Sequence, residues 1–499
     1  MPTAELARWG VCLLLSALSL ACAAANYNNL FDFTAASRAR RIPKGSRVSG
    51  ICFLGGASGA IACAIAPEPA LHGWWWLPFL VDWPGTLCIG RGGDYEPPDT
   101  RNAEERAAAD AAARAEEERA REAARVAREE YERRRAAMER SLVGCVLGTA
   151  VGDALGLACE GLSPRRRERM FPQADRYHLL PFGYGMCSDD TEHTVMLAQA
   201  LWHGSAYAED EDEARAVAAD FAWRLRFWLL GLPAGIGLAT LRAALKLWLF
   251  IPPRWSGVHS AGNGPAMRMA LVGVFYGARP ARLRAMVRAL TRITHTDPKA
   301  EQAAWTVAQA AHLSAAGGGR AAPAELAADC RAALGPEAAE WLALLERVAA
   351  SVERGEPTRQ FAASLGLARG VSGYAFHSVP VALHAWLSHP ADYRGAVLSA
   401  IECGGDADTV AAIVGGIAGA GTGREGIPAP WLEKLAEWPR TVGWMQKLAQ
   451  GLAARAAAPE RPAALGPVPA AGAAKVLLRN VFFMAVVLAH GFRRLLPPY

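Results

Sequence analysis

Helical patterns follow one another through the middle of this chain, and no strand pattern interrupts them. From Ser141 to about Ala457, Ala- and Leu-rich segments carry apolar residues at helical spacing and are interrupted by Gly and Pro. A half-buried β-strand needs alternating apolar and polar residues, and no convincing alternation occurs in this stretch. With 52% apolar and 20% charged residues, the chain has enough apolar side chains for a large core. The sequence therefore predicts an all-α domain over residues 141–457.

The net charge and the cysteine positions argue against several classes of protein. The formal net charge of +5 is small for 499 residues, and no block of Lys and Arg is interleaved with aromatic residues as a base-stacking surface requires. We therefore expect no nucleic acid among the partners. The ten cysteines are scattered from Cys12 to Cys403 without a CxxC pair, which argues against a zinc site and against a disulfide framework. This cysteine usage suits a reducing compartment.

Residues 1–95 differ from the rest of the chain in carrying three apolar runs, at 11–25, 48–66 and 74–89. Such runs are candidate membrane spans, and the Trp cluster in the third suits a membrane interface. The basic residues 38–47 should stay cytoplasmic, and three crossings would return the chain to the cytoplasm. We therefore expect a membrane-associated protein whose helical domain is cytoplasmic. The alternative is a cleaved signal peptide followed by a Gly-rich soluble hairpin.

Two further segments flank the helical domain. Residues 96–140 are dominated by Ala, Glu and Arg, and the charges recur at i,i+3 and i,i+4, which favours a long solvated helix. Leu, Ile and Val are nearly absent there, so we expect a helical spacer and no coiled coil. Residues 458–499 comprise an Ala/Pro linker and an apolar tail at 476–489. The tail is short for a membrane span, so we expect a buried or interfacial helix.

An acidic turn precedes an apolar helical run at residues 188–191, which read Ser-Asp-Asp-Thr. The adjacent carboxylates of Asp189 and Asp190 repel each other, so a structure that holds them together must compensate their charge. The helix itself is one compensation, because Ser, Asp and Thr satisfy free N–H groups at a helix start and suit its dipole. Taken alone, the motif is interpreted as a helix cap.

A second acidic turn lies far downstream, where Asp406, Asp408 and Thr409 precede another apolar helical run. It is not an EF-hand, because the third acidic position, central Gly and closing Glu are missing at the required spacing. If the two turns meet, their four carboxylates require cations, and oxygen-only ligands suit Mg²⁺ or Mn²⁺. A pair of such ions suits hydrolysis, because one orients the substrate and the other lowers the pKa of water.

A third element spans residues 144–160. Gly144, Gly148 and Gly152 are four residues apart, which predicts a smooth helical stripe for close packing. Asp153 and Glu160 are seven residues apart, so both could project from one side of a helical segment. The alternative is a tightly packed helix that ends in a surface Glu.

In this order, these elements resemble the ADP-ribosylglycohydrolase family, the relatives of the enzyme that reactivates dinitrogenase reductase. The resemblance covers roughly residues 141–457; each motif is weak alone, whereas their order and spacing are specific. It implies an orthogonal multi-helix all-α domain with two Mg²⁺ or Mn²⁺ ions in a cleft. The motifs are G-x-x-x-G-x-A-x-G-D-A-x-G-x-x-x-E at 144–160, [S/T]-D-D-T at 188–191, S-x-G-N-G-x-A-M-R at 260–268, T-H at 294–295, G-Y-x-x-H at 373–377 and G-x-D-x-D-T at 404–409.

The resemblance also implies roles for individual residues. Glu160 is expected to position or activate the attacking water, with Asp189 and Asp190 as the other catalytic candidates. Asp153 is expected to be structural, as a helix cap, and Cys187 and Cys403 are interpreted as packing residues. Ser188 stands where the family usually has Thr, and both supply a hydroxyl oxygen. The implied ligands of one ion are Ser188, Asp189 and Asp190, those of the other are Asp406 and Thr409 with Asp408 bridging, and the implied substrate-binding residues are Asn263, Gly264 and His295.

The function implied by the resemblance is hydrolysis of the glycosidic bond between ADP-ribose and a protein side chain, arginine being the expected acceptor. The expected partner is therefore an ADP-ribosylated protein. Two alternatives stay open: a catalytically silent member that only binds ADP-ribose, and a hydrolase of another ADP-ribose derivative. A bound hydroxyl-rich ribose and two cations would suit cleavage through an oxocarbenium-like state with water as nucleophile.

Overall fold

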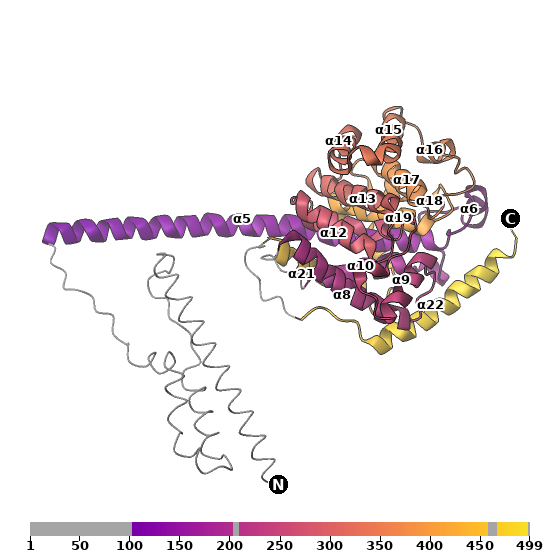
Figure 1. Ribbon diagram of the computed structural model, residues 1–499, viewed down its shortest axis with the longest axis horizontal. Coiled ribbons are helices and arrows are strands. Elements are labelled where there is room, and N and C mark those ends of the chain that lie inside the picture. The colour runs from indigo at the N-terminus through magenta and orange to yellow at the C-terminus, as the bar shows by residue number, and fades with distance from the viewer. Residues whose placement is uncertain (1–101, 203–208, 458–466, 498–499) are drawn as a thin grey trace, which may run out of the picture. The chain divides into compact units, whose positions relative to one another are not determined.

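A computed structural model describes residues 102–202, 209–457 and 467–497 of this chain. The predicted membrane segments within residues 1–95 lie outside the described residues. Contacts between residues divide the chain into two units, 1–115 and 116–499. In the described part of the chain, helices are joined by turns and isolated β-bridges, and the predicted all-α class is confirmed (Figure 1).

The helices carry the labels of Figure 1. The α-helices are α5 (Ala103–Leu157), α6 (Pro164–Met170), α7 (Asp189–Leu201), α8 (Asp210–Leu230), α9 (Leu238–Trp248), α10 (Pro253–Ser256), α11 (Met269–Tyr276), α12 (Pro280–Arg292), α13 (Pro298–Ala316), α14 (Pro323–Leu334), α15 (Ala339–Glu353), α16 (Thr358–Ser364), α17 (Ala375–Leu387), α18 (Tyr393–Ile401), α19 (Ala407–Thr422), α20 (Ala429–Glu433), α21 (Val442–Ala457) and α22 (Ala473–Arg494). Short 3-10 turns are η2 (Pro181–Gly183), η3 (Ala266–Arg268), η4 (Pro336–Ala338) and η5 (Arg424–Gly426).

Helix α5 confirms the predicted long charged helix and continues beyond it without a break. Its N-terminal part is exposed and carries ion pairs such as Arg121 with Glu117 and Arg128 with Glu132, each four residues apart. Exposed pairs of this kind contribute about 0.3–0.5 kcal/mol each. From Ser141 onward the same helix is buried. The spacer and the first core helix are therefore one continuous helix, which is exposed to solvent before Ser141 and buried in the domain after it.

The glycine stripe of α5 packs directly against α19, as the four-residue spacing predicts. A Cβ atom on Gly148 would overlap the carbonyl oxygen of Gly415, and one on Gly152 would overlap that of Ala411. Gly144 meets α19 in the same way one turn earlier. Only hydrogen at these positions lets the two backbones touch. This contact sets the start of α19, where the second acidic turn lies, beside the end of α5.

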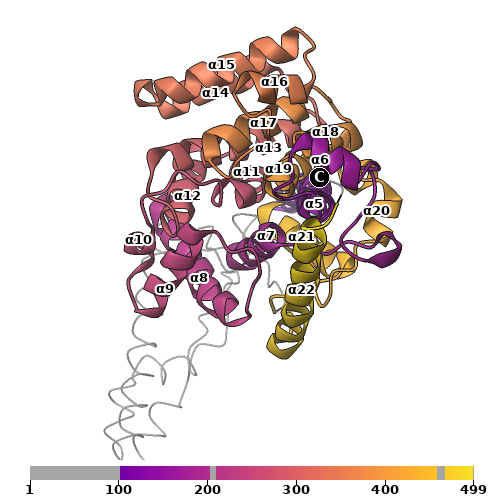
Figure 2. The ribbon, with the colours of Figure 1, turned by 90° about the vertical axis from the view of Figure 1, so that its right-hand side faces the viewer.

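The other helices pack around α19 and α13. Helix α19 contacts α13, α17, α18 and α11, and α13 in turn contacts α11 and α12. Helices α14 and α15 lie at one end of this core, whereas α8, α9 and α22 lie at the other end in both views (Figures 1 and 2). The first acidic turn begins α7, which contacts α8, α19 and η3. The two acidic turns thus start two helices that pack against each other.

Two described helices are long and apolar enough to cross a membrane by length and composition alone. The apolar window of α5 is 94% buried within the protein, as expected of a core helix. The corresponding window of α22 is only 17% buried. Helix α22 packs on the domain through Phe483, which lies in a small apolar cluster with Leu157 and Met186.

Candidate functional site

The structure brings the two acidic turns together. Ser188 is the N-cap of α7, and its hydroxyl lies 3.1 Å from Asp190 Oδ2. The hydroxyl of Thr409, 219 residues away in sequence, donates to the same Asp190 oxygen at 3.3 Å. Asp406 is the N-cap of α19, and Asp408 lies in its first turn. Ser188, Asp189, Asp190, Asp406, Asp408 and Thr409 therefore belong to one cluster at two helix N-termini.

Asp153 of α5 holds the first acidic turn through hydrogen bonds. Its carboxylate accepts hydrogen bonds from the backbone N–H of Ser188 at 2.9 Å and of Thr191 at 3.2 Å, and from the Thr191 hydroxyl. The predicted structural role as a helix cap is therefore confirmed. Burial raises the pKa of Asp153 to about 6, although these hydrogen bonds act in the opposite direction. Because α5 holds Asp153, the position of α7 is tied to the glycine stripe.

The carboxylates of the cluster are buried close to one another. Asp190 and Asp408 are each at most 5% exposed. Burial raises the pKa of both groups well above the ordinary value, and the neighbouring carboxylates raise it further. The pKa of Asp189 is raised for the same reasons, with burial first. Asp190 Oδ1 and Asp408 Oδ1 are buried without a hydrogen-bond partner among the described residues.

This arrangement fits divalent cations by its chemistry. An unpartnered buried carboxylate oxygen costs free energy, and a hard cation is a partner that such oxygens suit. No three His, Cys, Asp or Glu side chains within the described ranges are already placed to hold a metal ion. Hydroxyl oxygens add to the carboxylates here, because Ser188 and Thr409 direct their hydroxyls to Asp190. Cation binding by the cluster therefore stays a prediction, supported by the donor set.

Glu160 lies at the edge of the cluster in a turn, not on a helix. Helix α5 ends at Leu157, so the expected helical segment that would carry both Asp153 and Glu160 on one side does not reach Glu160. The N–H of the next residue, Gly161, bonds the carbonyl of Gly405 at 2.6 Å, which ties this turn to the second acidic turn. Glu160 is exposed at the surface, yet partial burial of its carboxyl group and the nearby Asp406 raise its pKa.

The loop that contains Asn263 and Gly264 borders the second acidic turn. The Asn263 amide donates to Asp406 Oδ2 at 2.6 Å, and the Asn263 backbone N–H donates to the carbonyl of Gly373 at 3.0 Å. His295 is only 3% exposed and packs beneath this loop, since a Cβ on Gly264 would lie 3.0 Å from its Cε1 atom. Burial lowers the pKa of His295 to about 3. The substrate-binding roles of these residues stay predictions.

Arg268 supports the same loop, and the sequence reasoning gave it no role. Its guanidinium is fully buried and donates to the Gly264 carbonyl at 2.8 Å and to the Thr294 hydroxyl at 3.2 Å. Burial lowers its pKa to about 9, and nearby Asp189 opposes this change. Arg268 ends the 260–268 motif directly after the apolar residues Ala266 and Met267. A charged residue that follows an apolar pair within a motif could have indicated this buried role.

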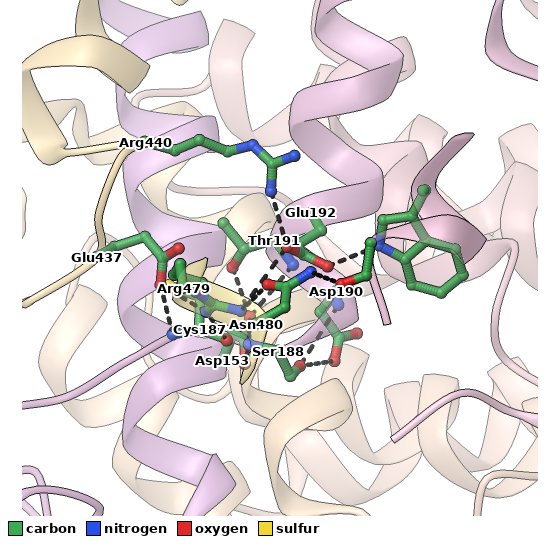
Figure 3. A network of polar contacts seen from close by, with 12 residues as sticks. Asp153, Cys187, Ser188, Asp190, Thr191, Glu192, Glu437, Arg440, Arg479 and Asn480 are labelled. Carbon is green, nitrogen blue, oxygen red and sulfur yellow. Dashed lines mark hydrogen bonds and ion pairs between the residues drawn. The ribbon is translucent and has the colours of Figure 1, made fainter. Parts of the chain in front are cut away.

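A second group that sequence reasoning missed lies behind the first acidic turn (Figure 3). Arg479 of α22 donates to the Cys187 carbonyl at 2.5 Å and pairs with Glu437 at 2.7 Å. Glu437 in turn accepts the Cys187 N–H at 3.0 Å. Glu192 pairs with Arg440 at 2.7 Å. Arg479 of α22 therefore bonds the carbonyl of the residue before Ser188, and its ion-pair partner Glu437 bonds the N–H of that residue.

The two cysteines beside the acidic turns are packing residues, as expected. Cys187 and Cys403 are buried within the large apolar core. Burial raises the pKa of the Cys403 thiol to about 12 and that of Cys187 well above its ordinary value. Both therefore remain protonated thiols near neutral pH.

Comparison with known proteins identifies one family. The model of the ADP-ribosylglycohydrolase family matches residues 134–462. The ADP-ribosyl-[dinitrogen reductase] glycohydrolase of Rhodospirillum rubrum is 28% identical over 307 residues, covering 60% of this chain and 90% of that protein. The ADP-ribosylarginine hydrolase Tri1 of Pseudomonas putida is 31% identical over 335 residues, covering 64% of this chain and 79% of that protein. A solved structure of an ADP-ribosylglycohydrolase-related protein complex matches with a TM-score of 0.43 and 27% identity, covering 64% of this chain and 99% of that chain.

Proposed function

The chain belongs to the ADP-ribosylglycohydrolase family, hydrolases that act on ADP-ribose glycosidic bonds, and from this premise we propose that it removes ADP-ribose from arginine side chains of proteins. The observation that carries the proposal is the meeting of two acidic turns from distant parts of the chain, with Glu160 beside them. The name of the Pseudomonas relative supports arginine as the acceptor.

Two Mg²⁺ or Mn²⁺ ions are the proposed cofactors. Ser188, Asp189 and Asp190 would hold one, Asp406 and Thr409 the other, and Asp408 would be shared. When bound, these ions supply charge stabilisation for the ribose hydroxyls and lower the pKa of water. The unpartnered oxygens of Asp190 and Asp408 support this assignment.

The remaining chemistry falls to the side chains around the cluster. Asn263 is oriented by Asp406 and Gly373, so the turn at Gly264 is held in place to bind phosphate or ribose through backbone N–H groups. Glu160 lies at the exposed edge, where water has access. A raised pKa suits Glu160 to accept the proton of the attacking water, whose oxygen bonds to the anomeric carbon. The bond from the anomeric carbon to the guanidine nitrogen breaks, and the nitrogen keeps the bonding pair and takes up a proton from solvent, while Glu160 returns its proton to solvent.

The direct test is hydrolysis by the full chain. Proteins carrying ADP-ribose on arginine or on serine are incubated with Mg²⁺, with Mn²⁺ and with EDTA, and released ADP-ribose is measured. We expect release from arginine that EDTA abolishes and that Asp408→Asn lowers at least about a thousandfold. The exposed Asp175→Asn is the matched control and should retain full activity.

Other results of this assay would each favour a different alternative function. Binding of ADP-ribose without release in any metal would identify a catalytically silent member and contradict the enzymatic proposal. Release only from serine, or only from another ADP-ribose derivative, would contradict arginine as acceptor. Full activity in EDTA would contradict the cation assignment while leaving hydrolysis in place.

We also propose that residues 1–95 attach the protein to a membrane and that the helical domain is cytoplasmic. The apolar runs at 11–25, 48–66 and 74–89 and the basic residues 38–47 support this topology. A reporter fused after residue 95 should report the cytoplasm. A periplasmic signal from that fusion would contradict the placement.

A further inference from the structure

The C-terminal helix α22 exposes large apolar residues on the side that faces away from the domain. Its buried residues are Arg479, Asn480 and Phe483, and Met484, Val486 and Val487 are partly buried against the domain, so the inner side carries both polar and apolar groups. The exposed side is strongly apolar. Its large exposed residues recur at three- and four-residue spacing and form one stripe: Leu477, Leu478, Val481, Phe482, Leu488 and Phe492, followed by Leu495 and Leu496.

A second group of exposed apolar residues lies on α8, α9 and the turns that follow them. Two of these residues, Leu232 and Phe250, have positive φ angles of 54° and 59°. Turns with such backbone angles normally carry Gly, Asn or Asp. Here bulky side chains occupy them, and Phe250 is 82% exposed. The whole group comprises Trp223, Phe227, Leu230, Leu232, Leu238, Leu245, Trp248, Leu249, Phe250 and Trp255.

The elements that carry the two groups are in contact. The Asn480 amide of α22 donates to the carbonyl of Gly231, which follows α8, at 2.8 Å. Helices α8, α9 and α22 lie at the same end of the domain in both views, away from α14 and α15 (Figures 1 and 2). We call their joint exposed surface the apolar face. Contiguous apolar surfaces of this kind mark sites of protein or membrane contact.

The charged residues interleaved with the apolar residues of this face are basic, whereas the acidic residues of α8 all precede its exposed aromatic residues, four of them in its first turn. No Asp or Glu occurs between Asp220 and Asp297, and none follows Glu460. Cations are interleaved with the exposed aromatic rings instead. The Arg226 guanidinium lies 5.4 Å from the centre of the Trp223 ring, and the Arg254 guanidinium lies 4.1 Å from that of Trp255. Trp, Arg and Lys side by side suit the headgroup level of a bilayer, where apolar and anionic groups meet.

We propose that the apolar face rests on an anionic phospholipid bilayer, with the outer stripe of α22 and the turn at Phe250 entering the boundary between headgroups and acyl chains. Helix α22 lies in the plane of this interface and does not cross it, because Arg479 and Asn480 are bonded to the domain along its other side. A second copy of the chain is a poorer occupant, because a twofold contact would set the cations of one copy against those of the other. The inference is independent of the proposed hydrolysis.

The test uses the full chain reconstituted with vesicles of phosphatidylcholine and phosphatidylglycerol. A photo-crosslinking benzoylphenylalanine replaces Phe482 or Phe250 on the apolar face, and Glu346 on α15 serves as the control position. We expect lipid adducts at Phe482 and Phe250 and at least about tenfold fewer at Glu346. Crosslinks from Phe482 to a second copy, or to residues 1–95, or adducts equal to those at Glu346, would overturn the proposal.

Charge variants test the anionic requirement in the same full chain. Arg242→Glu with Arg254→Glu reverses two exposed cations of the apolar face, whereas Arg331→Glu with Arg347→Glu makes the matched change on α14 and α15. Each lost cation weakens attraction to an anionic surface, so the first pair should lower the lipid adducts at Phe482 at least about fivefold and the second should not. Equal adduct yields from both pairs, or from vesicles of phosphatidylcholine alone, would overturn the anionic assignment.

Discussion

Arg479→Met should destabilise the domain and loosen the first acidic turn at the same time. The substitution keeps the apolar stem and removes the guanidinium that pairs with Glu437 at 2.7 Å and bonds the Cys187 carbonyl at 2.5 Å. Glu437 is 3% exposed, so its charge would stay buried without a counterion. Breaking a buried ion pair by removing one partner costs about 3–5 kcal/mol. We expect a loss of that size in the free energy of unfolding.

The measurement is a double-mutant cycle with Glu437→Gln, read by urea unfolding. The glutamine introduced by this substitution carries no charge and still has an oxygen to accept the Cys187 N–H, so the double variant should regain at least about 2 kcal/mol over Arg479→Met alone. The lost Cys187 carbonyl bond should also weaken Mn²⁺-induced stabilisation, because Ser188 is the next residue. A loss below about 1 kcal/mol, or strictly additive single effects, would refute the idea that α22 is fastened through this pair.

Three further outcomes are expected. Asp408→Asn should raise the unfolding free energy of the cation-free protein at pH 7 by at least about 1 kcal/mol, because it removes a crowded buried charge, and should abolish the rise in Tm on adding Mn²⁺; a fall in cation-free stability would contradict this. Gly148→Ala should cost about 2–3 kcal/mol because its Cβ meets the Gly415 carbonyl. In the same thermal unfolding assay Gly443→Ala, which has open space around it within helix α21, should be neutral or stabilise by up to about 1 kcal/mol. Burial lowers the pKa of His384 from 6.5 to about 4, so between these pH values the unfolded chain binds a proton that the folded protein does not, and the free energy of unfolding should fall by up to about 3 kcal/mol as pH drops from 6.5 to 4. Urea unfolding of His384→Gln should lack this pH dependence, and an unchanged dependence would contradict its assignment to His384.

The parts of the fold that follow from local chemistry could be predicted from the sequence. The glycine spacing at 144–152 allows one kind of contact, a close helix pair, and α19 supplies it. Both acidic turns begin helices, as side chains suited to free N–H groups predict. The Ser188 side chain does cap α7, whereas Asp406 at the start of α19 makes no side-chain capping bond and accepts from Asn263 instead. The predicted helix through Glu160 was wrong because Gly161 takes a positive φ of 71° and turns the chain toward Gly405.

The parts that depend on distant contacts could not be predicted in this way. Arg479 interrupts an apolar run, and nothing nearby in sequence indicates that its partners are Glu437 and Cys187. The composition changes at Ser141, but the helix does not, because neither Gly nor Pro separates the charged part from the buried part. Composition reports what surrounds a helix, whereas continuity depends on backbone propensity.

The distribution of cations around the site gives the strongest physical reason to expect a metal there. The buried arginines near the acidic turns already have partners: Arg479 and Arg440 neutralise Glu437 and Glu192, and Arg268 is bonded to backbone carbonyls. Among the described residues, none of these guanidinium groups bonds Asp190 or Asp408, whose Oδ1 atoms have no hydrogen-bond partner. Arginine side chains thus neutralise Glu437 and Glu192, whereas the carboxylates of Asp190 and Asp408 have no arginine partner among the described residues. Such a cluster is stable with its carboxylates ionised only when cations from solution complete it.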